Sequence, residues 1–174
     1  MKRIRRKTLI DHVCREERKF IPEDKKTFTA LDLLGMDGFL DSLKLTLLLY
    51  DFDLIPKEVC NEFACRCAER ALGNIKDPDP RSVAAIAAKR AWMKGEISDA
   101  KLDAAWDAAY NAVLDTPRAN SLDALYAAMD SAIIDARASA WEASWHAAWA
   151  ASDWEAERTW QMEELKKMLR EAQA

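Results

Sequence analysis

The sequence predicts an all-α protein, either a multi-helix bundle or a short helical array whose alanine-rich helices pack closely. Alanine, the strongest helix former, accounts for 31 of the 174 residues. Glycine occurs four times, proline five times, and β-branched residues are few, so a sandwich or barrel would lack its usual turn and strand residues. Hydrophobic residues, at 50%, are too frequent for a disordered chain, and charged residues, at 32%, are too frequent for a membrane span.

A chain of this length is expected to form one domain with a sizeable core. We predict a single helical domain over residues 1–174. Within it, residues 1–55 form an N-terminal helical segment, and residues 56–174 form a helical core rich in alanine and tryptophan. The sequence leaves open whether the first segment packs on this core or is a separate module.

The N-terminal segment contains signals for three short helices. One is predicted over residues 8–20, with Pro22 after its end. Thr29 is a suitable N-cap for a second helix, which ends before Gly35. Residues 39–50 alternate like a strand but also present an apolar helical face. Their leucines, with no valine or isoleucine among them, favour a helix.

The helix boundaries in the second part are marked by proline, glycine and capping residues. Pro56 begins a helix for which Gly73 is the expected left-handed stop. Asp79 and Pro80 begin the next helix, which ends near Gly95. A third helix follows, with Ser98 as its predicted cap and Thr116 and Pro117 after its end.

The last region begins at Asn120 or Ser121 and contains no glycine or proline. It is long for one globular helix, so we expect a break near Ser152 and Asp153, or else one long hairpin arm. Three tryptophans in this region recur at every fourth position among small residues. We expect them to fill the gaps between closely apposed alanine-rich backbones, where truncation of a buried one to alanine costs about 3–5 kcal/mol. They are Trp141, Trp145 and Trp149.

Negative charge is concentrated in the second half of the chain. Residues 1–90 contain 18 Lys and Arg against 15 Asp and Glu, whereas residues 91–174 contain 8 against 15. Aspartates recur there at helical spacing with few compensating cations. Such a stripe is either an ordinary solvated surface or a contact for a basic groove on a partner protein. Its members are Asp99, Asp103, Asp107, Asp115, Asp123 and Asp130.

Positive charge is concentrated at the N-terminus, where five cations occupy positions 2 to 7. Such a run is typical of a frayed, solvated end, or of an arm that contacts nucleic-acid phosphates. No apolar stretch of signal-peptide length follows it. The residues are Lys2, Arg3, Arg5, Arg6 and Lys7.

No motif in the sequence indicates catalysis or cofactor binding. A nucleotide loop, a Gly-x-Ser-x-Gly elbow and a His-Glu-x-x-His helix are all missing. The cysteines (14, 60, 65 and 67) lack zinc-ligand spacing, and we expect buried thiols in a reducing cytoplasm. His146 is interpreted as a surface or boundary residue. We therefore predict a non-enzymatic protein without metal or cofactor, and without a membrane span.

Part of the chain resembles a helical family encoded in phage and bacterial genomes, whose members are described as immunity-protein-like. The resemblance covers about residues 57–160. It is carried by Cys-Ala-Glu-Arg at 67–70, by Asp-Pro-Arg-Ser at 79–82, by Gly-Glu at 95–96 and by the Ala-Trp segments up to Trp160. It implies a phage or prophage origin and a non-enzymatic binding protein.

These observations lead to one main functional hypothesis and two alternatives. The main one is a phage-encoded protein that binds and inhibits a partner protein in the host cytoplasm. The partner would be a host-defence component, as for an anti-CRISPR protein, or a cognate toxin. The alternatives are a nucleic-acid-binding protein that uses the basic N-terminus, and a homo-oligomeric structural protein.

Overall fold

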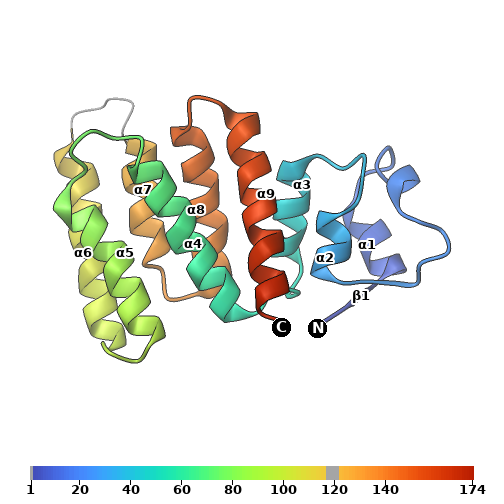
Figure 1. The fold of residues 1–174 in the computed structure, drawn as a ribbon, viewed down its shortest axis with the longest axis horizontal. Helices are drawn as coiled ribbons and strands as arrows, with labels where there is room; N and C mark the ends of the chain where they lie inside the picture. Colours follow the sequence, from blue (N-terminus) through green and yellow to red (C-terminus); the bar gives the residue numbers. More distant parts are fainter. Residues whose placement is uncertain (1, 117–121) are drawn as a thin grey trace.

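The computed structural model describes residues 2–116 and 122–174, and these ranges form an elongated array of nine α-helices (Figure 1). The short N-terminal elements lie at one end of the array, and α5 and α6 lie at the other. The helices are α1 (Arg6–His12), α2 (Ala30–Leu34), α3 (Asp41–Thr46), α4 (Lys57–Leu72), α5 (Pro80–Met93), α6 (Asp99–Asp115), α7 (Leu122–Ser131), α8 (Ala136–Ala150) and α9 (Trp154–Glu171). The all-α prediction of closely packed helices is confirmed.

Helix α4 is the central element of the core. It packs against α5, α7, α8 and α9, so opposite faces of one helix are covered by protein. Phe63, Cys60 and Cys67 on α4 are therefore all inaccessible to solvent. Pro56 precedes this helix as predicted, but Gly73 ends it in a right-handed conformation and not in the expected left-handed one. The positive φ in the following turn is found at Asp77.

Small side chains form the buried face of α8 and much of that of α7. On α8, Ala140, Ala143 and Ser144 are fully buried. Because such side chains are short, α8 can approach α4 and α7 closely. The predicted close approach of alanine-rich helices is thus confirmed.

The tryptophans of α8 lie beside this contact and not within it. Trp141 and Trp145 are half-buried and stack on each other with ring centroids 5.2 Å apart, and Trp149 is 60% exposed. Trp145 and Trp149 also meet Trp154 of α9 edge to face. The prediction that the indoles fill gaps between backbones is therefore wrong for the exposed Trp149, whereas Trp145 lies between α8 and α9 against Trp154.

The N-terminal segment is built from short elements with larger side chains. Thr29 and Asp32 form a reciprocal capping box at the start of α2, as the cap at Thr29 predicted. The helix favoured over residues 39–50 is present as α3 and a π-helical turn, η2 (Leu47–Asp51). Residues of this segment and of α4, α8 and α9 belong to one continuous hydrophobic cluster.

The helix predicted over residues 8–20 is shorter than expected. Helix α1 ends at His12, because Val13 is extended, and a separate 3-10 turn, η1 (Arg18–Phe20), follows. The intervening charged residues are mostly exposed, so further helix would have no apolar face to bury. The ring of Phe20 instead covers Gly38, where a Cβ atom would lie 2.2 Å from it.

Helix α5 begins with Asp79 as its N-cap and is followed by the left-handed Gly95, and α6 ends before Thr116, all as predicted. The last region has two breaks where one was expected. The predicted break lies at residues 151–153, where Asp153 caps α9, and the other separates α7 from α8. The predicted start at Asn120 or Ser121 lies outside the described residues. Among the described helices, none combines the length and apolar character needed to cross a membrane.

Candidate functional site

The outer face of α6 carries the first three aspartates of the predicted stripe. Asp99, Asp103 and Asp107 are exposed and follow one another at every fourth position, while Leu102 and Ala109 on the opposite side are fully buried. This amphipathic pattern was predicted from the sequence. Asp99 accepts a hydrogen bond of 2.8 Å from Trp92 Nε1 on α5.

Two apolar side chains continue the same face toward the end of α6. At 100° per residue, Tyr110 and Leu114 fall on the arc that runs from Asp99 to Asp107. Tyr110 is 40% exposed and Leu114 is 62% exposed. Tyr110 is also stacked on Trp106, with ring centroids 5.5 Å apart, so the aromatic part of the face is held in place. We refer to Asp103, Asp107, Tyr110 and Leu114 as the α6 face.

The other three aspartates of the predicted stripe do not extend this face. Asp115 pairs with Arg81 at the start of α5, 2.8 Å away, and Asp123 is half-buried on α7. Asp130 is only 5% exposed and faces α8. Its assignment to an exposed partner-binding stripe is therefore wrong, because α7 turns this position toward its neighbour.

The basic N-terminus is attached to the body of the protein. Ile4 and Arg5 form strand β1 (Ile4–Arg5), which pairs with β2 (Thr27–Phe28). Lys2 pairs with Asp53, and Arg6 Nε donates to the Pro22 carbonyl oxygen at 3.0 Å. The remaining three cations of the run are exposed, and no ion pair to them is found among the described residues. They are Arg3, Arg5 and Lys7.

The cysteines divide into one exposed and three buried thiols. Cys60, Cys65 and Cys67 are fully buried, as predicted, whereas Cys14 is exposed. Burial raises the pKa of both the Cys60 and Cys65 thiols to about 12. These two groups are therefore inert thiols at neutral pH.

A buried arginine is enclosed by the tryptophans of α8 and α9. Arg158 is 1% exposed, and its guanidinium carbon lies 4.7 Å from the Trp145 ring centroid and 4.6 Å from that of Trp154. Its Nη1 donates to Gln161 Oε1 at 2.8 Å. Burial lowers the pKa of Arg158 to about 10. Cation–π contacts on two sides thus stabilise a guanidinium inside the core.

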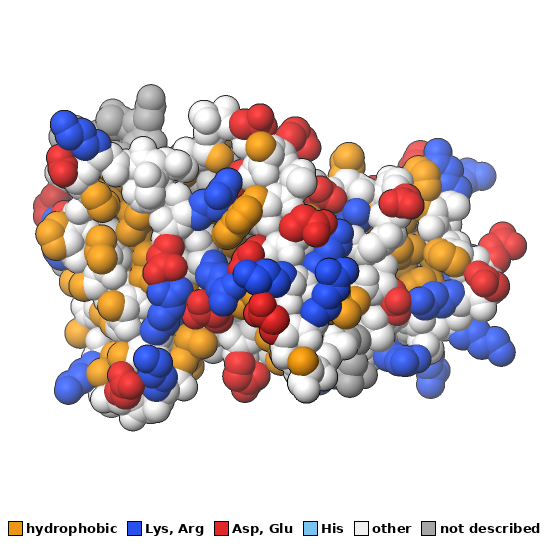
Figure 2. Space-filling model, in the orientation of Figure 1, with side chains coloured by type: hydrophobic (Ala, Val, Ile, Leu, Met, Phe, Trp, Pro, Cys, Tyr) orange, Lys and Arg blue, Asp and Glu red, His pale blue; other side chains and the backbone are white. Residues whose placement is uncertain are grey.

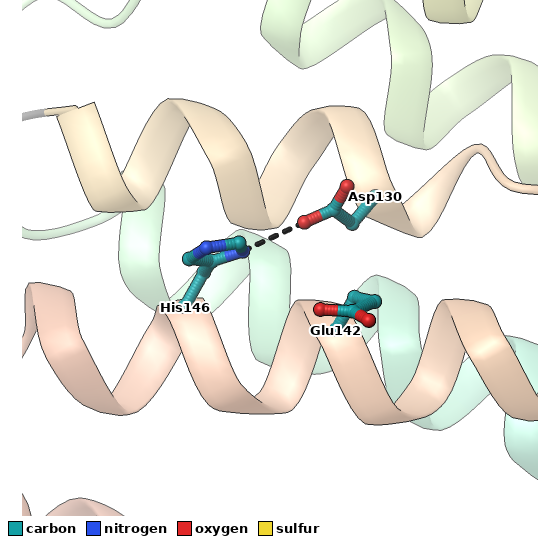
Figure 3. A group of neighbouring side chains, drawn as sticks. All are labelled: Asp130, Glu142 and His146. Atoms are coloured by element: carbon teal, nitrogen blue, oxygen red, sulfur yellow. Dashed lines mark hydrogen bonds and ion pairs between the residues drawn. The ribbon is translucent and has the colours of Figure 1, made fainter.

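An aspartate and a histidine form a pair between α7 and α8. His146 Nδ1 donates to Asp130 Oδ2 at 2.7 Å (Figure 3). Tyr126, one turn before Asp130 on α7, stacks on the imidazole with a centroid distance of 5.1 Å. The His146 side chain is 27% exposed and that of Asp130 is 7% exposed, so the pair reaches solvent through the imidazole.

Glu142 completes a group of three potential metal ligands. It lies one turn before His146 on α8, and its carboxylate lies on the same side of the helix (Figure 3). One ligand atom from each of Asp130, Glu142 and His146 lies within 4.8 Å of the others. Among the described residues, no other group of three His, Cys, Asp or Glu side chains meets this condition.

The surroundings of His146 are strongly negative. Burial by itself would lower the pKa of this imidazole. The hydrogen bond to Asp130 and the charges of Asp130, Asp123 and Glu142 outweigh burial, so the pKa of His146 is raised above its ordinary value. The imidazole is therefore protonated over a wider pH range than a free histidine.

Sequence reasoning placed His146 at a boundary but missed its partners. The available signal was the Glu-x-x-x-His spacing on a helix, which sets Glu142 and His146 on one face. Asp130 could not be added, because its approach depends on how α7 pairs with α8.

A search for related proteins found no matching family model, no matching curated protein and no matching solved structure. The resemblance to an immunity-protein-like family therefore stays a prediction.

Proposed function

We propose that this protein is a non-enzymatic binding protein that inhibits a basic partner protein through the α6 face. The observation that carries the proposal is the combination of exposed carboxylates and exposed apolar side chains on one helix face. Charged groups steer a partner of opposite sign toward a surface, and central aromatic or aliphatic groups supply affinity after contact.

The position and the fixed geometry of the α6 face support this function. Helix α6 lies at one end of the array, on the side opposite the N-terminal elements (Figure 1). Hydrophobic side chains reach the surface over α5 and α6 in the view of Figure 2. Because α6 is packed on α5 and α7, little conformational entropy is lost when the face is covered.

The charge of the face favours a protein partner with a basic groove. Asp103 and Asp107 form no ion pair with the described residues, so their charges are available to a partner. A groove that normally holds nucleic acid offers the complementary charge. A nuclease-like toxin or a nucleic-acid-guided defence effector has such a groove, and both agree with the resemblance to immunity proteins and with a phage origin.

Affinity capture with matched variants tests this function. The bait is the full chain, and the variant carries Asp103→Lys and Asp107→Lys. A control variant carries Glu23→Lys and Asp24→Lys, which make the same charge change at exposed positions in the N-terminal segment. We expect the wild-type chain and the control variant to recover at least one basic protein. The α6 variant should recover at least about tenfold less of that protein. The activity of that protein should fall when the wild-type chain is added.

Two outcomes would contradict the proposal. One is that no protein recovered by the wild type depends on the α6 face. The other is that the chain shifts nucleic acid in an electrophoretic assay, that salt weakens this binding steeply, and that Arg3→Glu with Lys7→Glu abolishes it. The second result would favour the nucleic-acid-binding alternative.

A further inference from the structure

The group formed by Asp130, Glu142 and His146 has the composition of a metal site. Two turns of α7 and two turns of α8 face each other here. Tyr126 and Asp130 come from one helix, and Glu142 and His146 from the other. The imidazole nitrogen and the two carboxylates converge on the space between the helices (Figure 3).

The charge at this place is negative even when His146 is protonated. Asp130 is buried, and a buried carboxylate is costly unless an opposite charge compensates it. Glu142 and Asp123 add two further negative charges around the same imidazole. Among the described residues, no lysine or arginine forms an ion pair with any of these three carboxylates. The one positive charge of a protonated His146 therefore leaves an excess of negative charge.

We propose that Asp130, Glu142 and His146 bind a divalent transition-metal ion, with Zn²⁺ as the best-matched ion. One imidazole nitrogen and carboxylate oxygens are ligands that Zn²⁺ accepts, and three protein ligands leave a fourth position for water. Mg²⁺ and Ca²⁺ prefer oxygen ligands in larger number, so the imidazole selects against them.

The distances require only small shifts of the side chains, since His146 Nδ1 and Asp130 Oδ2, now 2.7 Å apart, must separate slightly to admit an ion. Ligand atoms around a tetrahedral Zn²⁺ ion lie roughly 3.4 Å apart, since each is about 2.1 Å from the ion. The three ligand atoms here are within 4.8 Å of one another, and they belong to side chains on adjacent helices. The ion takes the place of the proton that now joins His146 to Asp130. Binding therefore releases that proton.

Metal titration of the purified full chain tests the site. Cys14 is exposed and could bind Zn²⁺ by itself, so the measurements use a Cys14→Ser background after treatment with a chelator. Calorimetry with Zn²⁺ gives stoichiometry and affinity, and visible absorption of added Co²⁺ reports the coordination. We expect one ion per chain, and higher thermal stability with Zn²⁺ than with Mg²⁺.

Substitution of each ligand provides the decisive comparison. His146→Gln, Asp130→Asn and Glu142→Gln should each weaken Zn²⁺ binding at least about tenfold. His12→Gln and Asp24→Asn change the same residue types elsewhere and should leave the Zn²⁺ affinity unchanged. Circular dichroism shows whether each variant is folded. If Asp130→Asn does not fold, Glu142→Gln still tests the site, because Glu142 is only half-buried.

The proposal is overturned if Zn²⁺ and Co²⁺ show no saturable binding. It is equally overturned if the three ligand variants bind Zn²⁺ as tightly as His12→Gln does. Neither result bears on the α6 face, which the capture experiment tests with different residues.

Discussion

Residues 2–55 and helices α4–α8 bury side chains of different size. Large aliphatic and aromatic residues, such as Leu9, Phe28 and Leu45, form the interior of the N-terminal segment. Alanine and serine, such as Ala140, Ala143 and Ser139, form much of the contact among α4, α7 and α8. Short irregular elements need long side chains to reach a common core, whereas long helices can meet backbone to backbone.

The two regions also differ in buried polar groups. Among the described residues, Lys44 is the one buried polar side chain of the first region, whereas the others, including Lys89, Asp130, Arg158 and Gln161, lie on α4–α9. Each of these has a hydrogen-bond partner. Lys89 donates to the Ile133 carbonyl oxygen in the turn between α7 and α8, and the other three bond to groups on the same or a neighbouring helix. Closely packed small residues thus leave room for long polar side chains, and these in turn need defined partners.

The largest expected effect of a substitution is the truncation of a leucine in the N-terminal region. Leu45→Ala should lower the free energy of unfolding by about 2–5 kcal/mol, because Leu45 is fully buried and its removal leaves a cavity. Denaturant unfolding measures this change. Leu40→Ala is the control, since Leu40 is 70% exposed, and an equal loss there would contradict the assignment of the core.

Enlargement of a side chain should be the damaging change in the alanine-rich region. Ala143→Leu should destabilise the protein by about 1–3 kcal/mol, because the added atoms separate α8 from its neighbours. The same substitution at the exposed Ala104 on α6 should have little effect. If both variants unfold like the wild type, the close contact of α8 is refuted.

The buried lysine of this region should make stability depend on pH. Burial lowers the pKa of Lys89 to about 8, while its ordinary value in an unfolded chain is 10.5. Above pH 8 the unfolded chain therefore holds a proton that the folded chain has lost, and the free energy of unfolding rises with pH, by about 1 kcal/mol between pH 8 and 9.

Comparison with Lys89→Met isolates this effect, because the buried thiols and other titrating groups are present in both proteins. The difference between the unfolding free energies of the wild type and Lys89→Met should change by about 1 kcal/mol between pH 8 and 9. A difference that is constant between pH 7 and 9 would show that Lys89 titrates normally.

The smallest effect is expected at the margin of α8. Trp149→Ala should cost less than about 1 kcal/mol, because the indole is 60% exposed and its centroid lies 6.2 Å from that of Trp154 in an edge-to-face pair. This is far below the cost expected from the sequence for a buried tryptophan. A loss as large as that of Leu45→Ala would restore the idea that the indoles fill the core.

The sequence predicted most of the helices because their signals are local. Pro56, Asp79, Gly95 and Asp153 mark ends through capping and backbone geometry, which depend on a few neighbouring residues. The helical-wheel pattern of α6 also predicted correctly which side of the helix is buried and which is exposed. The helix over 8–20 was predicted too long, since periodicity there did not show that residues 15–19 have nothing to pack against.

Composition and local spacing by themselves determined that the chain is helical, where most of its helices begin and end, and that the first half of α6 presents carboxylates. The tertiary structure decided which side chains fill the interior and which residues meet across helices. The burial of Asp130, its pairing with His146 and the position of the tryptophans all depend on the orientation of α8 against α7 and α4. That orientation is set by the summed packing of many small contacts, which no short stretch of sequence encodes.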